Sequence, residues 1–213
     1  MSPTLFTKLS LLWSFRRELY FVSLAFIAAL LLPVIAVIIL ANTGIDIVSE
    51  RLATVNINTQ EVEIRDPATG KVITTLKSTA AWPVKGVVTL EFGEIDLPYQ
   101  PLHTGIDIGS PSRKVGDPVT AFLPGKVMYA GEIFWGFGKH IIIDHGDNIT
   151  SVYAHLDKIF VVPGQEIKTT DQVIGNEGST GWSTGPHLHF EIRVFGIPVN
   201  PRTFLIGIPL DQS

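Results

Sequence analysis

Two histidines stand two positions apart in the segment 185–193, where polar and apolar residues alternate. On an extended strand, side chains at i and i+2 point to the same side of a sheet, so His187 and His189 are predicted to lie about 7 Å apart along one strand. Two neighbouring imidazoles suit a metal site in which one ring holds the ion and the other reaches the substrate. Glu191 and Arg193 continue this polar face, and the opposite face is a core-facing row of Leu188, Phe190, Ile192 and Val194.

A second cluster lies upstream, where His103 and Asp107 stand four positions apart. Gly105 between β-branched neighbours argues against a helix in this segment. In a fully extended chain the two side chains would be about 13 Å apart. The backbone must therefore bend if both are to meet one ion, and glycine makes such a bend cheap. Taken alone, the segment would equally suit an exposed loop histidine before an aspartate that caps a turn.

A third cluster contains Tyr153, His155 and Asp157, which a continuous strand would place on one face. Taken alone, His155 would suit a half-buried surface position. The three clusters together hold four of the six histidines in the chain, which favours a shared site. We interpret the other two, His140 and His145, as a strand-end residue and a turn residue.

The chain has no cysteine, so a transition-metal site must be built from histidine and carboxylate. His103, Asp107 and His189 would give Zn²⁺ three ligands and leave the fourth position to water, as in catalytic zinc sites. Zinc lowers the pKa of bound water to about 7 and polarises a carbonyl. His155 and His187 would then be free to transfer protons or to stabilise an oxyanion. No His-Glu-x-x-His motif occurs, which excludes a helical zincin.

The elements that must position these clusters are strands. From Trp82 onward, short β-branched runs are separated by Gly and Pro turns, without a stretch of helical periodicity. This pattern predicts a mainly β domain, with a compact antiparallel sheet or sandwich, over residues 81–213. The predicted strands are 87–90, 118–122, 125–130, 140–144, 149–154 and 188–194.

Residues 21–41 carry no charge and match the roughly 20 apolar residues that cross a bilayer as a helix. A signal peptide has a shorter apolar region, of about 7 to 15 residues, and a small-x-small cleavage site, whereas Ile39 stands two positions before Ala41. We therefore predict an uncleaved single-pass anchor. Because Lys8, Arg16 and Arg17 precede it, residues 1–20 are predicted to be cytoplasmic, and the catalytic domain periplasmic or extracellular.

Residues 42–80 are mixed polar and β-branched, with one hairpin signal. The alternating segment 61–65 and the segment 71–76 are separated by Asp-Pro-Ala-Thr-Gly, which is turn chemistry. We predict a stalk that holds the following domain away from the membrane. A flap over a cleft is the alternative role.

The segment from about Trp82 to Pro201 resembles the lysostaphin-type, or LytM-type, zinc metallopeptidases that hydrolyse peptidoglycan. The resemblance rests on five motifs in order along the chain: His103-Thr-Gly-Ile-Asp107, Asp144-His-Gly146, Tyr153-Ala-His155-Leu, Gly178-Ser-Thr-Gly-Trp-Ser-Thr-Gly-Pro-His-Leu-His-Phe-Glu191 and Val199-Asn-Pro201. It implies a compact antiparallel β-sheet with a groove above it.

The resemblance also implies roles for single residues. His103, Asp107 and His189 match the zinc ligands of that family, and His155 and His187 match its catalytic pair. The implied function is a membrane-anchored zinc endopeptidase that cleaves peptide stems or cross-bridges of bacterial peptidoglycan, with a regulatory cell-envelope protein as a candidate partner. His140 stands where the family often has Asn, and residues 94–102 stand where the family often has a longer or more basic insert. Both differences leave substrate preference open.

Two other functions compete with this interpretation. A LytM-type fold can serve as a binding module that activates or recruits other cell-wall enzymes, although such proteins usually have broken metal motifs and all five positions are filled here. The segments 125–127, 162–164 and 173–175 suit a lipoyl-like hybrid barrel, which also occurs on single-span membrane adaptors of export pumps. Those adaptors carry a long helical hairpin with heptads, and the sequence has no such stretch. The net charge of −4, with no basic run, argues against nucleic-acid binding.

Overall fold

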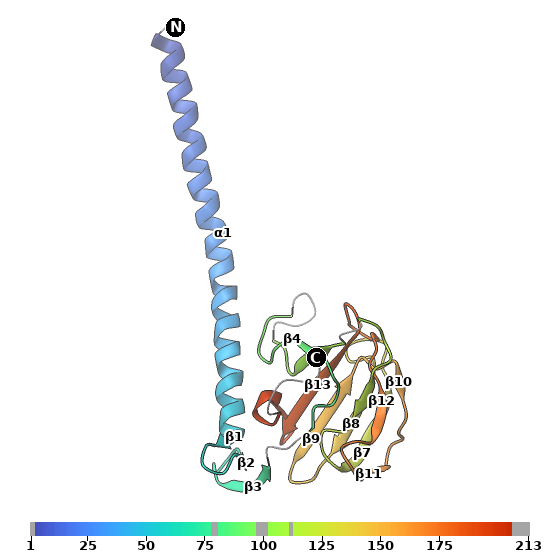
Figure 1. Ribbon diagram of the computed structural model, residues 1–213. Coiled ribbons are helices and arrows are strands. Elements are labelled where there is room, and N and C mark those ends of the chain that lie inside the picture. Colours follow the sequence, from blue (N-terminus) through green and yellow to red (C-terminus); the bar gives the residue numbers. More distant parts are fainter. Residues whose placement is uncertain (1–2, 78–80, 97–101, 111–112, 206–213) are drawn as a thin grey trace. The chain divides into compact units, whose positions relative to one another are not determined.

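The computed structural model describes residues 3–77, 81–96, 102–110 and 113–205, without the side chains of residues 3–15, 17 and 42. The chain divides into two compact units, Met1–Ala41 and Asn42–Ser213. Each unit has its own architecture, helical in the first and mainly β in the second (Figure 1).

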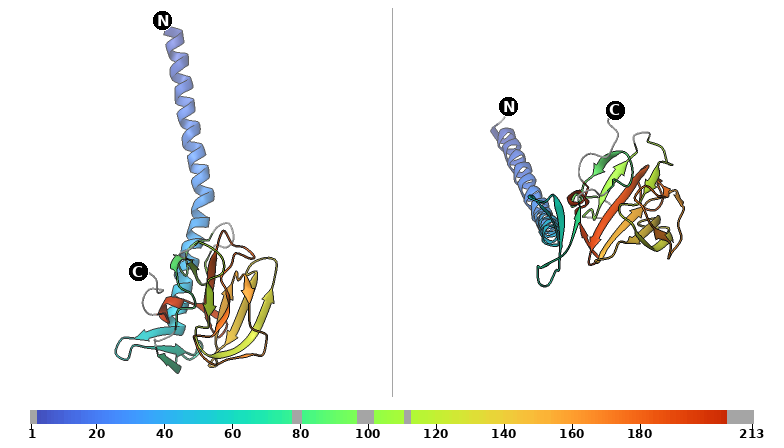
Figure 2. Two further views of the ribbon diagram at one scale, coloured as in Figure 1. Left: turned by 45° about the vertical axis from the view of Figure 1, so that its right-hand side comes forward. Right: turned by 60° about the horizontal axis from the view of Figure 1, so that its bottom comes forward.

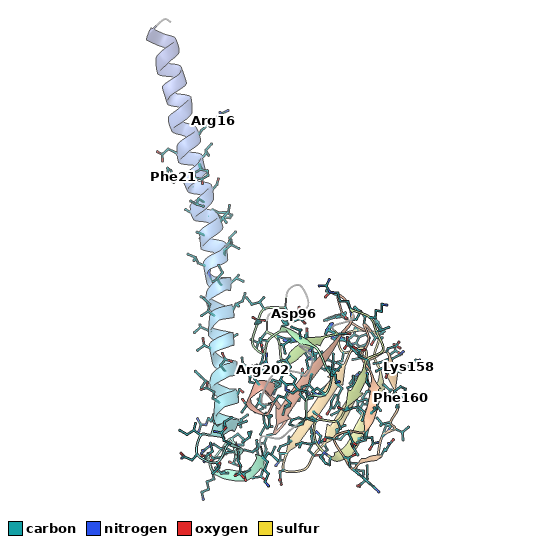
Figure 3. The ribbon with its side chains drawn as sticks, viewed as in Figure 1. Arg16, Phe21, Asp96, Lys158, Phe160 and Arg202 are labelled. Atoms are coloured by element: carbon teal, nitrogen blue, oxygen red, sulfur yellow. The ribbon has the colours of Figure 1, made fainter. Side chains whose placement is uncertain are left out.

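Helix α1 (Pro3–Leu52) forms the first unit and continues past Ala41 into the second. Its part from Glu18 to Leu52 is long and apolar enough to cross a membrane. Many apolar side chains between Leu19 and Val48 are exposed, among them Phe21 at 55% and Leu40 at 72% (Figure 3). A helix that is apolar all round is normally surrounded by other apolar groups, in a protein core or in lipid. The N-terminal helix therefore has the surface of a membrane-associated segment.

A three-stranded antiparallel sheet follows the helix, in the order β1 (Ala53–Asn56), β2 (Glu61–Arg65) and β3 (Val72–Lys77). The predicted hairpin is confirmed, because β2 pairs with β3. The Asp66 side chain closes its turn by accepting hydrogen bonds from the backbone N–H groups of Ala68 and Thr69. Buried Val62 and Ile64 belong to the same apolar core as the larger sheet. The predicted boundary between the stalk and the following domain lies between residues 80 and 81. It falls next to residues 78–80, which lie outside the described residues.

The larger sheet has eight antiparallel strands, in the order β11-β7-β8-β9-β13-β5-β4, with β14 paired to β13 (Figures 1 and 2). Its strands are β4 (Val87–Leu90), β5 (Ile106–Gly109), β7 (Gly125–Glu132), β8 (Lys139–Asp144), β9 (Ile149–Ala154), β11 (Glu166–Ile167), β13 (His187–Val194) and β14 (Ile197–Val199). A second sheet has the order β10-β12-β6, with strands β6 (Pro118–Thr120), β10 (Lys158–Ile159) and β12 (Val173–Asn176). A 3-10 turn, η1 (Pro201–Thr203), ends the described chain. The predicted mainly β, antiparallel fold is confirmed.

Strand β13 has the two faces that its alternation predicts. The row Leu188, Phe190, Ile192 and Val194 is fully buried in the core. Opposite it, His189 and Glu191 are buried on the polar face, where they contact each other. Strands β9 and β5 pair with β13 on its two edges. Asp107 lies on β5, and His155 directly follows β9.

The bend predicted between His103 and Asp107 is present, and it comes just before β5. Gly105 lies so close to β13 that a Cβ atom there would stand 2.3 Å from the carbonyl oxygen of Phe190. Only glycine tolerates this approach without a backbone shift. Strand β5 is too short, at four residues, to be recognised from periodicity.

One prediction about the third cluster is wrong. Tyr153 is fully buried on the core face, where it contacts Phe190, whereas His155 lies on the opposite side against His187 and His189. The reason is that β9 ends at Ala154 and His155 has a φ of +61°. This left-handed backbone reverses the alternation that a continuous strand would have had.

Candidate functional site

Three side chains from two segments meet at the polar edge between β13 and β5. The register of the two strands pairs His189 with Asp107, and His103 comes from the segment that precedes β5. The backbone of His103 is held by hydrogen bonds in both directions with Gly93 and Glu94. Both histidines are buried, whereas Asp107 is partly exposed.

The facing atoms of these residues form a small triangle. His103 Nε2 lies 2.9 Å from His189 Nδ1 and 3.0 Å from Asp107 Oδ1, and His189 Nδ1 lies 2.9 Å from the same oxygen. Three atoms so arranged cannot form three linear hydrogen bonds with one another. One point can, however, lie about 2.0–2.1 Å from all three, which are the bond lengths of zinc to histidine and carboxylate. The donor set therefore fits a zinc ion.

Hydrogen bonds on the outer side of each ring set its tautomer. His103 Nδ1 lies 3.0 Å from the carbonyl oxygen of Glu91, and His189 Nε2 lies 3.2 Å from Glu191 Oε1. Carbonyl and ionised carboxylate oxygens only accept hydrogen bonds, so these nitrogens carry the protons. The two rings therefore present opposite nitrogens, His103 Nε2 and His189 Nδ1, as lone-pair donors to the same point.

Electrostatics keep the carboxylates of the site charged. Burial alone would raise the pKa of Asp107, but hydrogen bonds from His103 and His189 outweigh it and lower the pKa far below its usual range. Burial likewise opposes ionisation of Glu191, yet the contact with His189 and the charge of Arg193 lower its pKa to about 2. For His189, burial lowers the pKa, but hydrogen bonds to Asp107 and Glu191 outweigh it and raise the pKa to about 9.

His155 and His187 stand beside the triangle without belonging to it. Their ring centroids are 4.8 Å apart, and His187 Nε2 lies 3.6 Å from Asp107 Oδ2. Each ring is again held from outside, because Nδ1 of His155 donates to Thr180 O at 2.8 Å and Nδ1 of His187 donates to Gly185 O at 2.9 Å. Their Nε2 atoms are therefore unprotonated in the neutral rings and can act as bases.

His155 is neutral at physiological pH. Burial lowers its pKa to about 3, and the neighbouring His189 and His187 act in the same direction. A neutral imidazole with a fixed tautomer can accept a proton at one defined atom.

Four of the five candidate site residues open onto one cleft. It is lined by Asp107, His155, His187 and His189, together with residues that the sequence did not single out as chemical: Asp96, Gly136, Phe137, Trp182 and Thr184. Asp96 lies on the segment after β4 (Figure 3). Phe137 stacks on His189 with ring centroids 5.6 Å apart, and its carbonyl oxygen accepts a hydrogen bond from the His155 backbone. Aromatic walls beside a few polar groups are typical of a ligand cleft.

The structure thus brings together all five residues singled out in the sequence: His103, Asp107, His155, His187 and His189. The remaining two histidines have structural contacts. His145 bonds Pro124 O and Ser151 Oγ, and His140 stacks on Tyr129. The outer hydrogen-bond acceptors were missed, and of these only Glu191 had a signal, its place in the alternation of β13.

Comparison with known proteins identifies the family of the β domain. Residues 101–201 match the sequence pattern described as "Peptidase family M23". The catalytic domain of lysostaphin from Staphylococcus simulans is 33% identical to the chain, which covers 90% of that domain with 55% of its own length at a TM-score of 0.50. The chain belongs to peptidase family M23. Peptidases of this family are zinc-dependent. One structural neighbour of the M23 domain is a zinc-containing peptidase from Vibrio cholerae, with 28% identity, 74% of this chain and 47% of that chain covered, and a TM-score of 0.52.

Two curated relatives of the M23 domain have cell-wall functions. The murein hydrolase activator NlpD of Escherichia coli is 41% identical over 128 residues, which are 60% of this chain and 31% of NlpD. The DD-carboxypeptidase/endopeptidase Mpg of Neisseria meningitidis is 41% identical over 108 residues, which are 51% of this chain and 24% of Mpg. The chain therefore spans about a third of one relative and a quarter of the other. A cell-wall-related role is common to both.

Proposed function

We propose that the protein is a zinc endopeptidase that cleaves peptide stems or cross-bridges of bacterial peptidoglycan. The observation that carries the proposal is the triangle of His103 Nε2, Asp107 Oδ1 and His189 Nδ1, with sides of 2.9–3.0 Å. These three atoms would hold the metal, and two further histidines face the same cleft. Zinc, when bound, would polarise the scissile carbonyl and lower the pKa of a coordinated water.

The other two histidines would move protons and stabilise charge. His155 is neutral and presents Nε2 to the cleft, so it can take a proton from the attacking water and later give it to the leaving amine. His187 can donate a hydrogen bond, once protonated, to the oxyanion that develops on the carbonyl. Fixed tautomers mean that neither ring must reorganise during the reaction.

Localisation follows from the N-terminal helix. We infer that residues 1–20 are cytoplasmic and that residues 21–41 form a single membrane anchor. Residues 42–80, which share the apolar core of the peptidase domain at 81–213, would hold that domain away from the membrane. The exposed apolar side chains of α1 support the anchor, and Lys8, Arg16 and Arg17 support an exported domain. Export is also what a substrate in the cell wall requires.

The proposal is tested by mass spectrometry of the fragments released from purified peptidoglycans of different cross-bridge type by the zinc-loaded full chain. We expect new peptide termini at one kind of bond, and no release after the metal is removed by a chelator. Release of no fragment from any peptidoglycan would contradict an endopeptidase.

The second candidate is an activator of other cell-wall enzymes, favoured by the 41% identity to NlpD. An activator needs no intact metal centre, whereas the proximity of His103, Asp107 and His189 supports one here. The two functions separate when a second cell-wall hydrolase is added: an activator would raise the release of fragments by that enzyme, including after substitution of His155.

A further inference from the structure

The buried carboxylate of Glu191 connects the two segments that supply the metal-binding histidines. Its Oε1 accepts hydrogen bonds from His189 Nε2 at 3.2 Å and from Thr104 Oγ1 at 2.5 Å, and its Oε2 accepts one from Arg193 Nε at 2.7 Å. Thr104 directly follows His103, so one side chain holds both ligand segments. We propose that Glu191 is a positioning residue of the metal centre, supported by Thr104 and Arg193. This inference rests on the proposed zinc site.

The environment of Glu191 is built to keep a charged carboxylate buried. The residue is 0% exposed, and a buried charge is costly unless it is paired and hydrogen-bonded. Arg193 supplies the opposite charge through a second contact, Nη2 to Oε2 at 2.5 Å. The guanidinium is itself held over the Phe137 ring, 6.0 Å from its centroid, and Phe137 stacks on His189. The contacts from Glu191 through Arg193 and Phe137 therefore lead back to His189.

The contact with Glu191 fixes the tautomer of His189, and with it the nitrogen that faces the metal. A carboxylate can only accept from His189 Nε2, which leaves Nδ1 as the lone-pair donor toward His103 and Asp107. Glutamine has nearly the same shape but carries one oxygen and one NH₂ group. In Glu191→Gln, the NH₂ group must face either Arg193 or the His189 N–H, so a donor meets a donor. One of the two contacts is lost in either orientation.

The test is the zinc affinity of the full chain, measured by competition with a chromophoric chelator. We expect Glu191→Gln to bind zinc about 10- to 100-fold more weakly, the usual effect of losing an outer hydrogen-bond partner. Thr104→Val, which removes one donor and keeps the shape, should weaken zinc binding in the same direction but less. Glu63→Gln is the matched control, because Glu63 pairs with Arg65 two positions along β2 and lies outside the residues that line the cleft. It should bind zinc as the wild type does.

A second measurement reports on the tautomer directly. In the metal-free wild type at about pH 10, where the pKa of His189 of about 9 leaves most rings neutral, ¹⁵N NMR should show His189 protonated at Nε2, and Glu191→Gln should show a mixture of both tautomers. Wild-type affinity and an unchanged tautomer in Glu191→Gln would overturn the inference. Should that variant not fold, wild-type zinc affinity in Thr104→Val would overturn it equally. If the wild type binds no zinc, the proposed function fails as well, whereas a zinc-binding wild type with an unaffected Glu191→Gln refutes only this inference.

Discussion

His155 Nδ1 donates a hydrogen bond to the carbonyl oxygen of Thr180 at 2.8 Å, and the two residues are also linked through their backbones, because Thr180 N–H donates to His155 O. This double link holds His155 at a φ of +61°. A non-glycine residue in this region is strained. Such strain is found where a side chain must be aimed at a functional cleft.

The strain predicts an unusual order of stability. His155→Gly should be more stable than His155→Ala by about 1 kcal/mol, because glycine adopts positive φ without steric cost. The measurement is urea unfolding followed by tryptophan fluorescence. The matched control is Thr150 on β9, within the regular strand, where Gly should be less stable than Ala. If the alanine variant were more stable than the glycine variant at both positions, the backbone of His155 would not be strained.

Glu177 predicts a pH-dependent loss of stability. Its side chain is fully buried, and burial together with Asp117 raises its pKa to about 7, although a hydrogen bond from the Ser110 backbone acts in the opposite direction. Between the ordinary value of 4.5 and about 7, the folded state holds a proton that the unfolded state has released. Stability therefore falls as pH rises through this window and stays reduced above it.

Glu177→Gln remains neutral and should remove this cost. The variant should match the wild type near pH 4.5 and exceed its stability at pH 8 by on the order of 2 kcal/mol. Thermal unfolding of both proteins across that pH range checks the prediction. A constant difference at all pH values would show that ionisation of Glu177 is not the cause.

The β1–β3 sheet should behave as part of the folded peptidase unit. Ile64 is fully buried in the shared core, whereas Ile73 on the neighbouring strand is 43% exposed. Ile64→Ala should therefore cost about 2–4 kcal/mol of unfolding free energy and Ile73→Ala clearly less. Chemical unfolding measures both. Equal, small effects would instead indicate a loose stalk.

The predicted topology places the C-terminus outside the cytoplasm. A reporter fused after Ser213 that works only when exported should be active, because the positive-inside rule assigns the end of α1 that carries Lys8, Arg16 and Arg17 to the cytoplasm. A second reporter that works only in the cytoplasm should be silent at the same position. The reverse pattern would place the domain where no cell wall is present.

The sequence predicted the parts of this structure that depend on local alternation and failed where distant contacts decide. The two faces of β13 could be read directly from the residues between His187 and Val194, because the period of a strand is local. The short strand β5 and the turned backbone at His155 could not, because Phe190 and Thr180 impose them from other segments. The cleft walls Phe137 and Trp182 had no chemical signal, since aromatic residues in turns are common on any surface.

The hydrogen bonds that the rings of the candidate metal site make on the side away from the metal could not be predicted either. The acceptor for His103 is the backbone carbonyl of Glu91, and a carbonyl is present at every position of a chain. Which one meets a ring nitrogen depends on the tertiary fold alone. The residues of the candidate metal site and their order could be predicted, but the tautomers could not.

The most direct test of the account separates His187 from His189 by zinc content and by the rate of peptidoglycan hydrolysis. His189→Ala removes a ligand, so it should lose both zinc and activity, as should His103→Ala and Asp107→Ala. His187→Ala should keep close to one zinc per chain and lose about 10²-fold or more in rate, the scale for removing a general acid or oxyanion donor; His155→Ala should do the same. Loss of zinc in His187→Ala with full zinc in His189→Ala would contradict the account.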